Sequence, residues 1–157
     1  MTGRSAAMQP ADDEHQRFAH YLQELADVSS QDEVGLVGRV LRDPDTVMAQ
    51  SAVVRHLDRR AAQLLTDAGF PDWFEAMVIV TAEWEFLVHR LREWMVLRSI
   101  TIDDTRGSED LLAASDWCQR TAARVLTSSA ALRLLAERGR TRRVRAAAGL
   151  RLAQQRR

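Results

Sequence analysis

The sequence predicts an all-α fold, a compact bundle of about seven helices around one long central helix. Apolar residues recur at spacings of three and four along most of the 157 residues, which is the periodicity of one buried helix face. Segments of alternating β-branched residues bounded by turns are absent, and 7 glycines and 3 prolines are few for a turn-rich fold. A single helical domain is expected over 12–155, after a flexible leader at 1–11 and before a basic tail at 156–157.

The first three helices are placed by their starts and ends. Three acidic residues open a helix over 12–28, where the positive end of the helix dipole favours negative charge. The segment Ser-Ser-Gln-Asp-Glu at 29–33 is typical of a helix start and precedes a helix over 31–42, although two glycines weaken it. A third helix begins at Pro44, because proline is tolerated in a first turn, and ends near Asp67, before Gly69.

The strongest periodic signal predicts the central helix, over 72–100. Its main stripe has spacings that alternate between four and three: Trp73, Met77, Val80, Trp84, Leu87, Leu91 and Trp94. Further apolar residues widen the stripe beyond what a surface helix needs, which indicates packing on more than one side with Trp84 near the middle. Core packing is the favoured interpretation of these tryptophans, and a surface that stacks a ligand is the alternative.

Three more helices complete the prediction. Ser108 starts a helix over 108–127, and Ser128 starts another that ends at Arg138, before Gly139. Thr141 caps the last helix, over 142–155.

Two helical segments resemble the hairpins of HEAT repeats. The first is Leu-Val-Gly-Arg-Val-Leu-Arg-Asp-Pro-Asp at 36–45, followed by Val47, Ala52 and Leu57; the second is 132–135, a turn at Gly139, then Val144, Arg145, Ala148 and Leu152. HEAT repeats typically have an Asp-Pro turn and then a Val-Arg, Ala, Leu pattern. The first segment lacks the Val-Arg pair and the second lacks Asp-Pro. The resemblance implies a binding scaffold and carries no catalytic residues.

Several classes of protein and site are not expected. No run of roughly 18 apolar residues is present, so neither a membrane span nor a membrane partner is predicted. The first five residues lack the apolar stretch of a signal peptide, which favours a cytoplasmic location. A single cysteine excludes an internal disulfide and a cysteine-cluster metal site, and Cys118 is interpreted as a buried thiol. No cofactor is predicted.

One polar grouping is weighed as a site. Glu85, His89 and Glu93 lie four apart and share one helix face with Arg92, so a metal site or an acid–base pocket is conceivable. A helical di-iron site, however, needs Glu-x-x-His on two helices and two more glutamates, and a salt-bridge row is the favoured interpretation.

Two further polar segments are interpreted in structural terms. His56 is followed by Asp58, Arg59 and Arg60, which predicts a solvated face. The pair at 103–104 lacks a third acidic residue at helical spacing, so a loop is favoured over a metal site.

Charge is distributed unevenly along the chain. The 22 basic residues are all arginine and balance 22 acidic residues, a composition typical of GC-rich genomes such as those of actinobacteria. Residues 1–117 hold 11 arginines and 21 acidic residues, whereas residues 118–157 hold 11 arginines and only Glu137. The densest group is the candidate partner-binding site: Arg138, Arg140, Arg142, Arg143 and Arg145. These arginines suit an acidic protein, the phosphates of a nucleic acid, or the acidic part of the same chain.

Three classes of function remain open. The first is a non-enzymatic cytoplasmic interaction or regulatory protein that binds an acidic protein partner. The second is a nucleic-acid-associated protein that uses the arginine-rich C-terminal helices. The third is a small all-helical enzyme that acts on an apolar substrate beside the tryptophan stripe. A homo-oligomer is compatible with each class.

Overall fold

The computed structural model describes residues 10–103 and 105–157, and helices are the only regular secondary structure in these ranges. The all-α prediction is therefore confirmed for the described chain. The helices are α1 (Pro10–Asp27), α2 (Glu33–Val40), α3 (Thr46–Leu64), α4 (Phe70–Val80), α5 (Glu85–Ile102), α6 (Ser108–Ala113), α7 (Asp116–Val125), α8 (Ser129–Arg138) and α9 (Arg142–Gln155). The predicted leader lies outside the described residues except at its last two positions, which already belong to α1.

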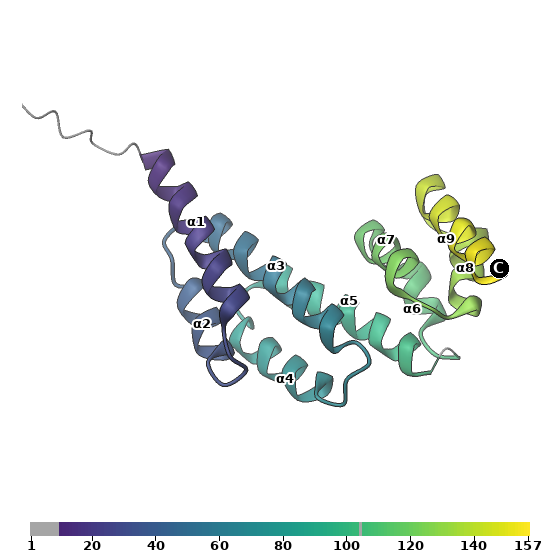
Figure 1. Cartoon of the computed structure of the whole chain (residues 1–157), viewed down its shortest axis with the longest axis horizontal. Helices are drawn as coiled ribbons and strands as arrows, with labels where there is room; N and C mark the ends of the chain where they lie inside the picture. Colours follow the sequence, from purple (N-terminus) through teal and green to yellow (C-terminus); the bar gives the residue numbers. More distant parts are fainter. Residues whose placement is uncertain (1–9, 104) are drawn as a thin grey trace, which may run out of the picture.

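The helices follow one another along a curved body (Figure 1). Helix α1 packs on α3, and α2 packs on α4. Helix α5 contacts α3, α4, α6 and α7, so it takes the central place. Helices α1 and α2 lie at one end of the longest axis, and α8 and α9 form a closely packed pair at the other end. One continuous apolar core connects the two ends.

The predicted helix over 72–100 is instead two helices, α4 and α5, with a turn at residues 81–84. The Thr81 hydroxyl donates to the carbonyl oxygen of Met77 at 2.7 Å, and the backbone N–H of Trp84 donates to the carbonyl oxygen of Thr81 at 2.8 Å. Trp84 then takes an extended conformation, with φ −111° and ψ 90°, before α5 begins. No glycine or proline marks this break, so tertiary packing overrides a continuous helical pattern.

The break changes the role of the tryptophan stripe. Trp94 is 1% exposed and lies in the core, whereas Trp84 is only half-buried at the start of α5. Trp73, Met77, Leu87 and Leu91 are also buried. The core interpretation therefore holds for most of the stripe, but the prediction that Trp84 lies at the middle of a central helix is wrong.

The predicted helix over 108–127 is also two helices, because the chain is extended at Ala114 and Ser115. Ser115 caps α7 by accepting a hydrogen bond from the backbone N–H of Cys118 at 3.2 Å. The Ser-Asp pair that opens α7 is an ordinary capping signal in the sequence. Upstream, Gly107 precedes α6 with φ +81°, a left-handed conformation that favours glycine.

The last two helices form the predicted hairpin, and its turn requires a glycine. A Cβ at Gly139 would lie 2.5 Å from the carbonyl oxygen of Leu135 and 2.8 Å from Val144. This close approach lets α9 fold back onto α8. Whether this hairpin or the α2–α3 segment belongs to the HEAT class stays a prediction.

We expect Trp94→Ala to lower the free energy of unfolding by about 3–5 kcal/mol, the usual cost of truncating a large buried aromatic residue. Trp84→Ala is the matched control and should cost clearly less, because Trp84 is half-buried. Denaturant unfolding followed by circular dichroism measures both. Equal losses in the two variants would contradict the described break between α4 and α5.

Candidate functional site

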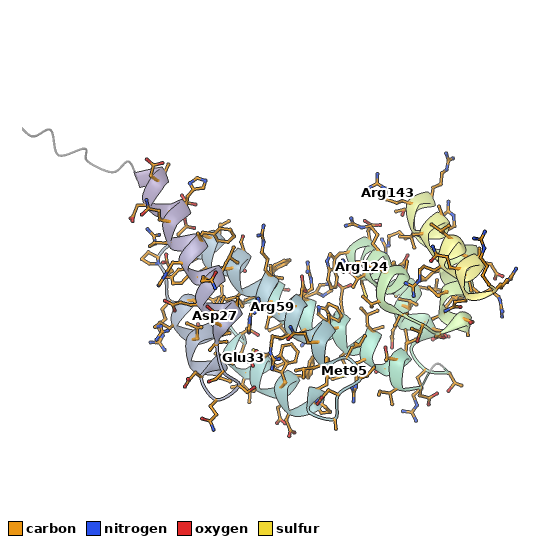
Figure 2. All side chains as sticks on the ribbon, viewed as in Figure 1. Asp27, Glu33, Arg59, Met95, Arg124 and Arg143 are labelled. Atoms are coloured by element: carbon orange, nitrogen blue, oxygen red, sulfur yellow. The ribbon has the colours of Figure 1, made fainter. Side chains whose placement is uncertain are left out.

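The predicted partner-binding arginines cluster where α8 turns into α9. Arg138, Arg140, Arg142 and Arg143 are exposed, and their guanidinium groups make no ion pair or hydrogen bond with the described residues. Figure 2 shows Arg143 at the start of α9, where this helix follows the turn from α8. We call these four arginines the basic end.

Arg145, the fifth predicted residue, differs from the other four. It is half-buried, and its Nη1 donates to the carbonyl oxygen of Gly139 at 2.7 Å. Arg151 has a similar structural role at the end of α7, where it donates to the carbonyl oxygens of Ala123 at 3.0 Å and Leu126 at 2.9 Å. Both arginines therefore satisfy helix carbonyl groups that would otherwise lack a donor.

A buried glutamine fixes the turn that carries the basic end. Gln119 is fully buried, and its Oε1 accepts a hydrogen bond from the backbone N–H of Arg140 at 2.8 Å. Its Nε2 donates to the carbonyl oxygen of Leu111 at 3.0 Å, at the end of α6. Thr141 caps α9 by accepting from the backbone N–H of Val144 at 3.1 Å. The exposed arginines thus project from an ordered turn.

The first two arginines of α9 lie at a position where they do not stabilise the helix. Arg142 and Arg143 occupy its first turn, which contains no acidic residue. The helix dipole places positive partial charge at this end, so each added cation opposes helix stability by roughly 0.3–1 kcal/mol. Arg138, in the last turn of α8, is at a favourable position by the same argument.

The opposite end of the protein is acidic. An open groove of about 680 Å³ lies between α1 and α2. Three carboxylates line it, those of Glu24, Asp27 and Asp32, together with the basic side chains of His20 and Arg39. Figure 2 shows Asp27 at this end of the body, far along the long axis from Arg143.

The predicted polar grouping at residues 85–93 does not form one cluster in the structure. Glu85, His89 and Arg92 are exposed and line a shallow pocket of about 610 Å³ beside Phe86. Glu93 is instead 6% exposed and accepts hydrogen bonds from the backbone N–H of Ser115 at 3.0 Å and from its hydroxyl at 2.8 Å. Glu93 therefore holds the start of α7 against α5.

The metal interpretations of this grouping and of the 103–104 pair find no matching geometry in the described chain. No group of three histidine, cysteine or acidic side chains there is arranged to hold a metal ion. His89 Nε2 lies 3.6 Å from Glu93 Oε1. Asp103 accepts from the Thr105 hydroxyl at 2.7 Å, as in an ordinary turn, and its neighbour at position 104 lies outside the described residues.

A buried polar network around Glu33 is the largest departure from the sequence prediction. Glu33 Oε1 accepts hydrogen bonds from His56 Nε2 at 2.7 Å, Arg60 Nε at 3.0 Å and Trp73 Nε1 at 2.9 Å. His56 is 2% exposed, so the predicted solvated face is wrong at this residue. The Nη2 of Arg59 donates to His56 Nδ1 at 3.0 Å, which leaves the His56 proton on Nε2.

Electrostatics keep Glu33 ionised. Burial disfavours its charged form and raises the pKa, but hydrogen bonds from His56, Arg60 and Trp73 outweigh burial and lower the pKa to about 2. The network joins α2, α3 and α4. The sequence shows only that His56 and Arg60 lie four residues apart and so share one face of α3. Glu33 and Trp73 belong to two other helices, α2 and α4.

A second polar junction joins the middle helices. Asp58, on α3, accepts hydrogen bonds from Arg90 Nη1 at 2.6 Å and Trp94 Nε1 at 2.8 Å, both on α5. The Arg90 guanidinium lies 3.6 Å from the ring centre of Trp117, on α7. Burial raises the pKa of Asp58, although Trp94 and Arg90 stabilise its charged form. We call Asp58, Arg90, Trp94 and Trp117 the central junction.

The single cysteine is not a candidate nucleophile. Cys118 is fully buried in α7, and burial together with the nearby Glu93 raises the pKa of its thiol to about 12. A thiol with this pKa is protonated at neutral pH and is a poor nucleophile. The interpretation of Cys118 as a buried thiol is confirmed.

Comparison with protein-family models, characterised proteins and solved structures found no match to this chain. None of the described helices combines the length and apolar character needed to cross a lipid bilayer.

We expect the Glu33 network to make stability depend on acid pH. A carboxyl whose pKa is lowered by folding stabilises the native state above its unfolded pKa, and this contribution disappears as the pH falls through the folded pKa of about 2. The wild type should therefore lose stability between about pH 5 and pH 2. At pH 7, the free energy of unfolding of Glu33→Gln should be about 3 kcal/mol lower than that of the wild type, because the buried hydrogen-bond donors around position 33 lose their ionised acceptor.

Urea unfolding measured from pH 7 to pH 2 tests this expectation. The difference in free energy of unfolding between the wild type and Glu33→Gln should become smaller as the pH falls. A constant gap across the whole range would contradict the role assigned to the ionised Glu33.

Proposed function

We propose that this chain is a non-enzymatic interaction protein that binds an acidic protein partner through the basic end of α8 and α9. One observation carries the proposal: Arg138, Arg140, Arg142 and Arg143 are exposed on an ordered turn and have no anionic partner among the described residues. Arginine suits such a partner, because its planar guanidinium forms paired hydrogen bonds with a carboxylate.

Electrostatics favour a carboxylate partner over nucleic acid. Proteins that bind nucleic acid through phosphates usually carry net positive charge, whereas this chain has a net charge of zero. Residues 1–117 have ten more acidic residues than arginines, and this part of the chain would repel an extended polyanion. A compact acidic surface can contact the basic end alone.

The described pockets do not favour the enzyme alternative. An enzyme site usually combines an enclosed, largely apolar cavity with a few convergent polar groups. The groove between α1 and α2 is open and lined by charged side chains, and the Trp94 indole is already hydrogen-bonded within the core. The tryptophan stripe therefore offers little surface for an apolar substrate.

We expect a short fluorescent polyglutamate peptide, which is small enough to contact the basic end alone, to bind the wild type at low salt and to bind an Arg142→Gln, Arg143→Gln variant about tenfold more weakly. Both arginines are exposed, so their neutralisation should leave the fold intact. The matched control is Arg42→Gln with Arg92→Gln, which removes two exposed arginines elsewhere. Fluorescence anisotropy at two salt concentrations measures the affinities, and unchanged binding in the first variant would contradict the proposal.

The same titration with a labelled DNA duplex tests the second candidate. Tight binding with a slope of log affinity against log salt near −0.9 per phosphate contact, lost in the Arg142→Gln, Arg143→Gln variant, would favour the nucleic-acid function instead. We expect polyglutamate to bind more tightly than the duplex at equal salt.

A further inference from the structure

The two charged regions of this chain lie at opposite ends of one body. Residues 12–45, which form most of α1, all of α2 and the turn after it, contain nine acidic residues and three arginines. The basic end lies at the far end of the longest axis (Figure 1). Among the described residues, no ion pair joins an arginine of the basic end to an acidic residue. Within a single copy, the two charged ends do not neutralise each other.

The acidic groove retains unused capacity to accept hydrogen bonds. Glu24 is paired with Arg39 at 3.3 Å and with His20. Asp27 accepts one hydrogen bond from Gln23 Nε2 at 2.7 Å. Asp32 accepts one from the Ser29 hydroxyl at 3.0 Å. An ionised carboxylate has about four acceptor positions, so each of the two aspartates can still receive a guanidinium.

We propose that the acidic partner of the basic end is a second copy of this chain, whose groove between α1 and α2 receives the arginines that project from the α8–α9 turn. This proposal rests on the proposed function, because it assigns a partner to the same arginines. Charge complementarity supports it: the groove has three carboxylates, and the basic end has four arginines without an internal partner in the described chain.

The geometry determines the kind of assembly. The two contacting surfaces are different and lie at opposite ends, so the contact is head to tail. Each added copy leaves one groove and one basic end unoccupied, and such heterologous contacts form open chains unless a rotation closes them into a ring. Because the contact is mainly between exposed charges, it weakens strongly with salt.

Sedimentation velocity of the wild-type protein tests the association. At about 0.01 M salt, where the screening length is about 30 Å, we expect species larger than one chain that grow with protein concentration. At about 1 M salt, where that length is about 3 Å, the protein should sediment as a monomer. A monomer under both conditions at high protein concentration would overturn the proposal.

Two variants identify the surfaces. The first, Arg142→Glu with Arg143→Glu, cancels the net charge of the basic end; the second, Asp27→Lys with Asp32→Asn, leaves Glu24 as the one carboxylate among the three that line the groove. Each alone should be a monomer at low salt. Their equal mixture should form a two-chain complex and nothing larger, because one variant supplies an intact groove and the other an intact basic end.

A matched control makes the same charge change outside the groove. Glu75→Lys with Glu83→Gln alters two exposed acidic residues and should associate like the wild type. Thermal unfolding checks that every variant is folded. Association that survives the groove variant but not the arginine variant would overturn the groove as the docking site.

The peptide titration separates this inference from the proposed function. Polyglutamate binding to a protein that stays monomeric at low salt would overturn the second copy as partner and leave the acidic-partner function in place. Failure of both measurements would overturn both proposals.

Discussion

Asp58 connects the acidic half of this protein to its basic half. Its carboxylate, on α3, receives hydrogen bonds from Arg90 and Trp94 of α5, and the Arg90 guanidinium stacks on Trp117 of α7. Because this central junction is part of a continuous core, the helices before and after α5 are fixed relative to each other. Burial makes the ionised carboxylate costly, and the two donors together with the apolar packing around Trp94 offset that cost.

The position of the central junction has an electrostatic consequence. Helix α3 connects the central junction to the acidic end, and α7 connects it to the basic end (Figure 1). The junction therefore keeps the two oppositely charged ends apart, although they attract each other. The Glu33 network joins α2 to α3 and α4 at the acidic end, and Gln119 holds the turn at the basic end. Both charged surfaces are therefore ordered before a partner arrives, which lowers the entropic cost of binding.

The sequence predicts much of this fold but little of its polar interior. Helical periodicity and capping residues locate most helices, and the hairpin around Gly139 agrees with its prediction. The break at Thr81 has no local signal, because the same hydrogen bond from a hydroxyl to the carbonyl oxygen four residues earlier occurs at Ser99 and Thr101 within α5. The arginines of the basic end are close together in the sequence, so the sequence alone shows the cluster. Glu33, His56 and Trp73 are far apart in the chain, so only the folded structure shows their contact.

The central claim is that the basic end stands away from the acidic body of its own chain. Spin labels at Ser30→Cys, near the acidic groove, and Ala147→Cys, on α9, measure this separation directly by pulsed electron resonance. The native Cys118 is buried and should not react with the label. In samples diluted with unlabelled protein, we predict one long distance that is the same at low and high salt. A short distance at low salt that lengthens at high salt would show that the arginines dock on the acidic part of their own chain, and would contradict the account.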